Sequence, residues 1–222
     1  MKVTIYPAII RANSHDVTIS VLAKDTTNQL KAMGGAGGVA AGSSVEAASD
    51  MTVTALVEFL NGTGSNHAVV SAPGRDILVN TRTDTTAKVF GQIKFTVDGL
   101  SFLSTDVKNK MNIASTVNLG AYAELSAGND LSIAALIGSI YALASAYSET
   151  GSIINTQSRP TAEVNVTAKA WIRGAENAKL SAANLLSLVA ATAENNNIYT
   201  KAYSYGFTAG GTGSVVSKAV NN

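Results

Sequence analysis

VVSAPGRDILV, at residues 69–79, contains an apolar strand end, a small polar turn, an Asp and the start of a second apolar strand. The stretch IIRANSHDVTI at residues 9–19 repeats this order of residue types, and AELSAGNDLSI at residues 123–133 repeats it again. A more degenerate fourth copy, IRGAENAKLSA at residues 172–182, lacks the Asp. Such repetition is the signature of stacked structural units.

The spacing of these copies defines the units. The first apolar residues after the four turns are separated by 60, 54 and 49 residues; they are Val17, Ile77, Leu131 and Leu180. A second strand of the same kind begins 34, 34 and 33 residues later, at Met51, Met111 and Val164. We therefore predict a single continuous solenoid over residues 1–222, with about four units that start near 17, 77, 131 and 180 and variable loops on one side.

Within each unit the local period is two. VTISV at residues 17–21 and MTVTA at residues 51–55 alternate apolar residues with Thr or Ser, which indicates strands with one buried face. Residues 131–147 and 182–193 are dense in Ala and Leu and offer a helical alternative. Alternation dominates, so we predict an all-β chain folded as a parallel β-helix, or β-solenoid, with no helix longer than about three turns.

The size of a coil follows from the constant half of each unit. Asp25-Thr26-Thr27 recurs as Asp84-Thr85-Thr86, 59 residues later and in step with the first unit. We interpret the long half of 33–34 residues as two coils. At roughly 16–20 residues a coil and about 4.8 Å between strands, the segment would stack about a dozen coils over about 50–60 Å.

Composition excludes several classes of function. Charged residues make up 14% of the chain and the net charge is +1, with no basic block, so we predict no nucleic-acid partner. The chain has no Cys, which removes disulfides and Cys-based zinc sites. The longest apolar run, at residues 136–146, is interrupted by Gly and Ser, and the first residues alternate. We therefore predict neither a membrane span nor a signal peptide in this segment.

Two groups of residues are predicted to shape the turns. Four Asp residues stand just before strands, where a carboxylate can accept hydrogen bonds from nearby backbone amides: Asp16, Asp50, Asp76 and Asp130. A glycine run with no following Lys-Ser or Lys-Thr is typical of a tight coil corner and not of a phosphate loop: Gly34, Gly35, Gly37 and Gly38.

Calcium binding by the Asp series is the alternative to a turn-fixing role, because stacked coils could bring carboxylates together. The glycine-rich calcium nonapeptide is absent, so we predict no metal and no other cofactor, and no effect of a chelator on stability. His15 and His67 stand beside turns and are interpreted as solvated. The Glu residues fall at unrelated points of their units, so we predict that the chain is not an enzyme: Glu46, Glu58, Glu124 and Glu149.

The densest aromatic cluster lies near the C-terminal end. Alternation places Tyr203, Tyr205 and Phe207 on one face of a strand. Aromatic residues often anchor interfaces, so this face is a candidate contact surface. A place in the core is the alternative that we favour.

The repeated units resemble those of giant filamentous adhesins of Gram-negative bacteria, the filamentous-haemagglutinin-like and leukotoxin-type exoproteins. The resemblance is carried by the phrase of turn, small residue, Asp and alternating apolar residues at 13–21 and 71–79, and by the Gly/Ala-rich tract at 34–42. It covers nearly the whole chain but weakens near residues 178–179, where the Asp is missing. It implies a right-handed parallel β-helix, export through the outer membrane, and adhesion to host or sister cells.

Three functions follow as hypotheses. The leading one is a structural and adhesive segment of an extracellular fibre on the bacterial surface, part of a longer array. The second is a filament subunit that associates with itself end to end or side by side, because open solenoid edges present unpaired backbone groups. The third is a carbohydrate-active β-helix, which would require clustered acidic residues.

Overall fold

The computed structural model describes residues 1–35, 38–94, 98–150, 155–206 and 214–215. Within them the chain alternates long strands with short ones, and none of these residues is helical. The strands, in chain order, are β1 (Lys2–Ile5), β2 (Ile9–Arg11), β3 (Val17–Gly34), β4 (Gly38–Phe59), β5 (Val69–Ala72), β6 (Ile77–Ile93), β7 (Asp98–Leu119), β8 (Glu124–Ala127), β9 (Leu131–Thr150), β10 (Asn155–Gly174), β11 (Lys179–Ala182), β12 (Leu186–Gly206) and β13 (Ser214–Val215).

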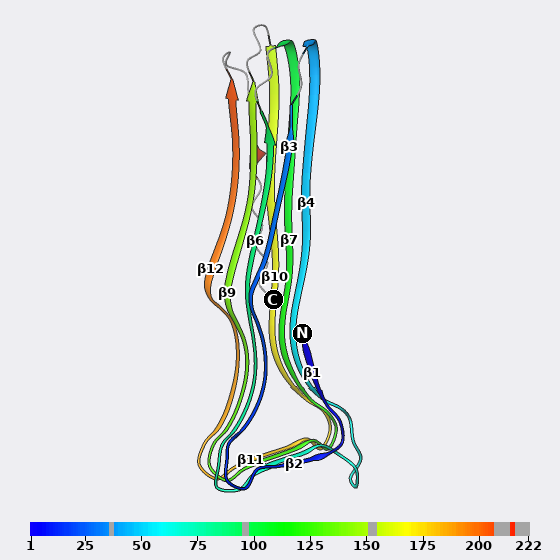
Figure 1. The fold of residues 1–222 in the computed structure, drawn as a ribbon, viewed down its shortest axis with the longest axis vertical. Helices are drawn as coiled ribbons and strands as arrows, with labels where there is room; N and C mark the ends of the chain where they lie inside the picture. The colour runs from blue at the N-terminus through cyan, green and yellow to red at the C-terminus, as the bar shows by residue number, and fades with distance from the viewer. Residues whose placement is uncertain (36–37, 95–97, 151–154, 207–213, 216–222) are drawn as a thin grey trace.

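These strands form three parallel sheets. Sheet A has the order β1-β4-β7-β10-β13, sheet B the order β2-β5-β8-β11, and sheet C the order β3-β6-β9-β12. The chain therefore runs along a long strand of sheet C, returns along a long strand of sheet A, crosses a short strand of sheet B, and begins the next coil. Figure 1 shows the two long layers, with the short strands closing them at one end. The prediction of an all-β parallel solenoid is confirmed.

The coils are much longer than expected. Val17 pairs with Ile77, Ile77 with Leu131 and Leu131 with Leu186, so successive coils contain 60, 54 and 55 residues. The expectation of roughly 16–20 residues a coil is wrong, because the two strands of each long half lie on opposite faces of one coil. Alternation identifies a strand but does not say how far the strand runs before the chain turns.

The start of the fourth unit is also corrected. Leu180 pairs with Leu125 in sheet B, whereas Leu186 is the partner of Leu131 in sheet C. The start predicted near residue 180 is therefore six residues too early. The fourth turn used for the alignment, residues 175–178, joins sheet A to sheet B, whereas the first three turns join sheet B to sheet C. In the last coil Leu185 stands where the earlier coils have the Asp before the strand.

The repeated Asp-Thr-Thr phrase pairs as its spacing indicates. Thr26 lies beside Thr85 and Thr27 beside Thr86, after a register shift between Ala23 and Thr26. Asp25 lies in this bulge with a φ of 54°. The bulge adds one residue to β3, which explains why the phrase repeats after 59 residues in a coil of 60.

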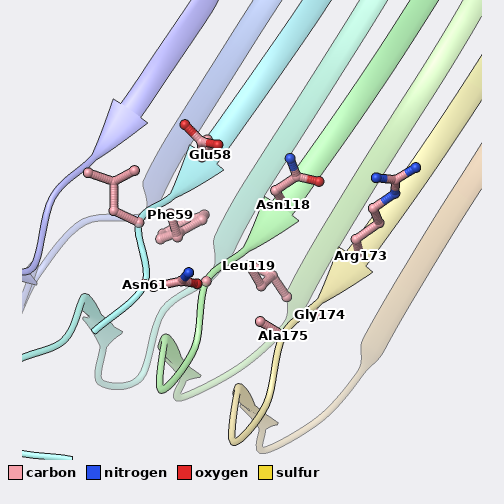
Figure 2. Close-up of a pocket in the computed structure, with 10 residues that line it drawn as sticks. Glu58, Phe59, Asn61, Asn118, Leu119, Arg173, Gly174 and Ala175 are labelled. Carbon is pink, nitrogen blue, oxygen red and sulfur yellow. The ribbon is translucent and has the colours of Figure 1, made fainter. Parts of the chain in front are cut away.

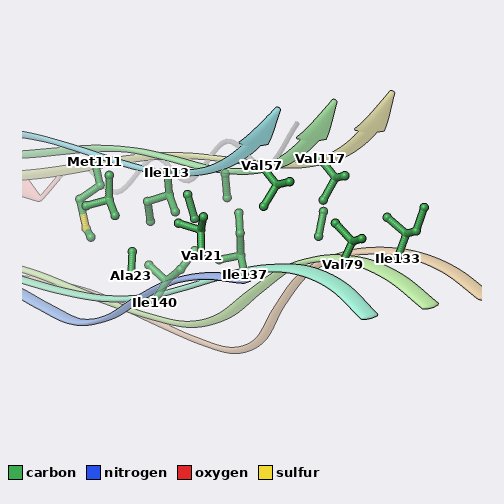
Figure 3. Packing of buried hydrophobic residues seen from close by; sticks show 14 of the residues in the cluster. Val21, Ala23, Val57, Val79, Met111, Ile113, Val117, Ile133, Ile137 and Ile140 are labelled. Carbon is green, nitrogen blue, oxygen red and sulfur yellow. The ribbon is translucent and has the colours of Figure 1, made fainter. Parts of the chain in front are cut away.

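The core lies between sheets A and C. Inward side chains alternate with outward ones along each strand, and Figure 3 shows the two layers meeting through branched apolar residues. Val57 and Val117 of sheet A, like Val79 and Ile133 of sheet C, are fully buried. Small and β-branched residues fill most of this interior, where the two long sheets face each other.

Polar side chains also point into the core, and several of them join the two long sheets. The Asn109 amide of β7 donates to the carbonyl oxygens of Ala87 in β6 and Leu143 in β9, at 3.0 and 3.1 Å. Two hydroxyl pairs at 2.8 Å do the same: Ser115 with Thr81, and Thr105 with Ser148. Because a buried polar group needs its partner, these contacts fix the register of sheet A against sheet C.

Candidate functional site

Three of the predicted Asp residues occupy the same corner of successive coils and form a ladder. The Asp76 amide donates to Asp16 Oδ1 at 3.2 Å, and the Asp130 amide donates to Asp76 Oδ1 at 3.1 Å. The Leu185 amide completes the series by donating to Asp130 Oδ1 at 3.2 Å. Each carboxylate thus accepts a hydrogen bond from the next coil and links two coils at the corner between sheets B and C.

Two Asn residues strengthen this aspartate ladder. Asn129 Nδ2 donates to Asp76 Oδ1 at 2.6 Å, and Asn184 Nδ2 donates to Asp130 Oδ1 at 2.8 Å. These two Asn residues were not predicted from the sequence. The available signal was the Asn directly before the Asp position in the last two coils, a side chain that favours turns.

Asp50 does not shape a turn, so its predicted role is wrong. It lies inside β4, on the outward face of sheet A. Lys110 of β7 forms an ion pair with it at 2.8 Å, and Asn112 donates to it at 3.3 Å. An Asp before an alternating apolar stretch marked a corner elsewhere, but here the strand simply continues through it.

The glycine run lies where the chain passes from sheet C to sheet A. Gly34 ends β3, Gly35 follows it, and Gly38 begins β4, while Gly37 lies outside the described residues. A Cβ on Gly34 would lie 2.5 Å from Val45 Cγ2, so the two layers approach each other closely there. A Cβ on Gly35 would meet nothing within 4 Å. Only Gly34 of this pair is therefore required by packing.

The aromatic cluster faces outward where it is described. Tyr203 pairs with Tyr147 on the outer face of sheet C and is 53% exposed, so the favoured core placement is wrong for this residue. Tyr205 belongs to β12 and pairs with Glu149, but its side chain and Phe207 lie outside the described residues. The prediction that alternate residues share one face of the strand was correct. Whether that face points into the core or outward depends on how the strand pairs with the neighbouring coil.

A shallow groove of about 310 Å³ lies at the corner between sheets A and B, a feature that sequence analysis did not find. Glu58, Asn118 and Arg173 line it from the same register position of three successive coils, as Figure 2 shows. The Arg173 guanidinium lies 3.8 Å from the centre of the Trp171 ring beside it. No repeat signal pointed to this column because its three residue types differ.

A strip of charged and polar side chains crosses the outer face of sheet A. Lys108 binds Asp106 at 2.7 Å, and Thr161 donates to the same carboxylate at 2.8 Å. Burial raises the pKa of Asp106, but the Lys108 and Thr161 hydrogen bonds outweigh it and lower that pKa below its usual value. Asp106 raises the pKa of Lys108 in turn. Asp106 and Lys108 therefore both stay charged at neutral pH.

A second ion pair lies at the bulge of sheet C. Arg82 Nε contacts Asp84 Oδ2 at 3.0 Å, and the Ser139 amide of the next coil donates to Asp84 Oδ1 at 2.9 Å. Burial raises the pKa of Asp84, but Arg82 and Ser139 together lower it below its usual value. Gly138 leaves the space for this pair, since a Cβ there would lie 2.4 Å from both Arg82 Nη2 and Asp84 Oδ1.

The edge of the stack formed by β11 and β12 exposes apolar residues that are buried one coil earlier. Leu186 and Leu188 are 46% and 52% exposed, whereas their partners Leu131 and Ile133 are fully buried. Leu185, also exposed, adjoins them. We call this surface the β12 edge.

The two histidines and Glu58 have local partners. His15 Nδ1 contacts Ser14 Oγ, and His67 Nδ1 contacts the Thr63 carbonyl, both at 2.9 Å. Glu58 forms an ion pair with Lys2 at 2.6 Å. The part of the chain that the structure describes holds no group of three or more His, Asp or Glu placed to bind a metal ion.

Comparisons of the chain with protein-family models, with curated proteins and with solved structures find no match. In the described ranges, no helix is long and apolar enough to cross a membrane. The function is therefore inferred from the geometry of the coils, their faces and their edges.

Proposed function

We propose that this chain is a structural segment of an extracellular bacterial fibre, in which the stacked coils are themselves the functional element. The observation that carries the proposal is the in-register pairing of long strands from coil to coil. β7 and β10, for example, pair continuously over twenty residues, from Leu100 beside Asn155 to Leu119 beside Gly174. Each coil is therefore held to the next by strand pairing along the length of its long strands.

The physical consequence of this pairing is a stiff element. Parallel strands of this length are held by evenly spaced backbone hydrogen bonds, and the core and the aspartate ladder add contacts between the same coils. Local opening of one coil exposes apolar surface on two others. A stack of this kind suits a load-bearing fibre.

The outward faces support a second part of the proposal, which is adhesion through surface contacts. They carry the charged strip of sheet A and the corner groove, which Arg173 lines and beside which Trp171 lies against Arg173. Trp171 is 39% exposed, and exposed Trp and Arg are frequent anchors of interfaces. We propose that this corner meets a cell surface or a sister filament.

The location is tested on the source cells. Antibodies raised against the purified chain should label fibres outside unpermeabilised cells in immunogold electron microscopy. An antibody against a cytosolic protein provides the control for cell integrity. Label confined to the cell interior in sectioned cells would overturn the extracellular proposal.

Adhesion is tested with coated beads. Beads that carry the chain should bind host or sister cells, and Trp171→Ala should reduce binding several-fold. The matched control is Thr167→Ala, which changes another outward position of β10 away from the groove. Equal binding by both variants and the unmodified chain would remove the corner from the proposal.

A further inference from the structure

The two edges of the coil stack each end in a short strand of sheet A, but the two short strands cover different halves of the long strands beside them. At one edge β1 pairs with the end of β4, Lys2–Ile5 beside Leu56–Phe59. At the other edge β13 pairs with Thr161 and Ala162, in the first half of β10. Among the described residues, nothing pairs with the outer edge of β10 at residues 171–174, the positions equivalent to those that β1 covers on β4.

This difference accounts for the exposed leucines of the β12 edge. Val17 and Ile19 occupy the same columns as Leu186 and Leu188 but are each only 9% exposed, and they lie in β3, which β1 contacts. The opposite half of β3 shows the converse: Leu30 is 37% exposed, although its partner Val89 is buried. One edge of the stack thus ends in β1, which covers the second half of a sheet A strand, and the other ends in β13, which covers the first half. Each edge lacks the cover that the other has.

We propose that a second copy of this chain docks on the β12 edge, head to tail and in the coil register. This inference rests on the proposed fibre function and names the partner of its growing edge. β1 of the second copy lies beside residues 171–174 of β10, its β2 beside β11 and its β3 beside β12. The registers within the chain fix these neighbours: Thr4 beside Arg173, Ile10 beside Leu180, and Val17 beside Leu186.

The apolar side chains brought together are chemically matched. Val3 and Ile5, which pack against the core in their own copy, cover Leu186 and Leu188. Lys2 comes to lie beside Trp171, where it adds a third cation to those of Lys169 and Arg173, so this contact opposes docking modestly. Burial of the leucines supplies the main driving force, because apolar area leaves water.

A second pair of like charges makes the register testable. Lys31 of the second copy lies beside Lys201, since Lys31, Phe90, Ser145 and Lys201 follow one another across sheet C. Both lysines are exposed, so they repel each other modestly. Replacing one of them with an acidic residue should lower the dissociation constant of a dimer docked in this register. A dimer in which the two lysines are not neighbours should not gain affinity from the same change.

Disulfide trapping tests the register directly, because the chain contains no Cys. In one copy Thr4 and Arg173 are three strand spacings apart, about 14 Å, which exceeds the reach of a disulfide. In docked copies they are direct neighbours. The variant Thr4→Cys/Arg173→Cys should therefore give a ladder of reducible oligomers on oxidation.

The matched control for trapping is Thr4→Cys/Thr167→Cys, which places the second thiol six residues away on the same outward face. It should stay monomeric on a non-reducing gel. Equal ladders from both variants, or no ladder from either, would overturn the proposed register. Circular dichroism of each variant verifies that the strands are retained.

Sedimentation of the full chain tests the energetics. Lys201→Glu should lower the dissociation constant about fivefold, as for an exposed ion pair, whereas Lys179→Glu, placed beside Ile9, should not lower it. Leu188→Lys should raise the constant at least about tenfold. A chain that stays monomeric at every concentration would overturn docking but leave the fibre proposal standing, since the immunogold experiment tests location independently.

Discussion

β9 and β12 are neighbouring strands of one sheet with the same alternation, yet only β9 has a buried face. Leu131 is fully buried and Leu186 is 46% exposed, although the two are partners in the register. β3, the strand at the opposite edge of the sheet, also buries the start of its inward face. The burial of a strand in this solenoid therefore depends on whether the facing sheet continues by one more strand beyond it, and not on the strand's own sequence.

The largest expected effect separates the two leucines. Leu131→Ala should lower the free energy of unfolding by about 2–5 kcal/mol, because it leaves a cavity in a closed core. Leu186→Ala removes the same atoms from a half-exposed site and should cost less than about 1.5 kcal/mol. Urea unfolding at low protein concentration measures both. Equal losses would mean that the β12 edge is covered even in the single chain.

A pair of glycines sharpens the contrast between an interior strand and an edge strand. Gly138→Ala in β9 would displace the ends of the Arg82 and Asp84 side chains and should cost about 1–2 kcal/mol, because their ion pair and the hydrogen bond from Ser139 are lost. Gly174→Ala, at the end of β10, meets nothing within 4 Å and should change stability by less than about 0.5 kcal/mol. Thermal unfolding of both variants gives the comparison, and a neutral Gly138→Ala would contradict the tight bulge.

The aspartate ladder provides the next comparison. Asp76→Ala removes the acceptor for the Asp130 amide and the Asn129 side chain, and should cost about 1–2 kcal/mol. Leu185→Asp extends the ladder at the β12 edge, where no described coil donates to it, and should leave the stability of the single chain nearly unchanged. Chemical denaturation tests both. An Asp76→Ala variant with an unchanged free energy of unfolding would mean that the ladder does not stabilise the fold.

The smallest expected effect is on pH dependence. Because the folded chain lowers the pKa of Asp84, this carboxylate contributes stability that is present above about pH 4 and is lost as the pH falls through the lowered pKa. Asp84→Asn should therefore flatten the acid side of a plot of unfolding free energy against pH. Asp106→Asn, which removes the other carboxylate whose pKa the fold lowers, should flatten the acid side in the same direction. Identical curves for all three proteins would contradict the role of Asp84.

The local features of the fold could be predicted from the sequence. The alternation in VTISV identified β3, and the Asp-Thr-Thr phrase identified two strands that pair. Both depend on a few adjacent residues and on the period of a strand. Asp76 was also recognised, although its hydrogen bond goes to the next coil and not to its own turn.

The remaining features depend on contacts between distant residues. The length of a coil, the start of the last coil and the strand position of Asp50 are all set by register, which a strand of alternating residues does not specify along its own axis. The groove column of Glu58, Asn118 and Arg173 has no common residue type to reveal it. Tyr203 was placed on the wrong face because the alternation alone does not distinguish inside from outside.

The orientation of the coils has a consequence for any fibre built from them. The strands run along the longest axis of the molecule, so the stack grows across that axis, by about 4.8 Å for each coil. Strands of 20–22 residues span about 65–70 Å, and a fibre would therefore be a flat tape, wide in the strand direction. Aligned tapes should diffract X-rays with a meridional reflection at about 4.8 Å and an equatorial one near 10 Å, the cross-β pattern usually taken as the mark of amyloid.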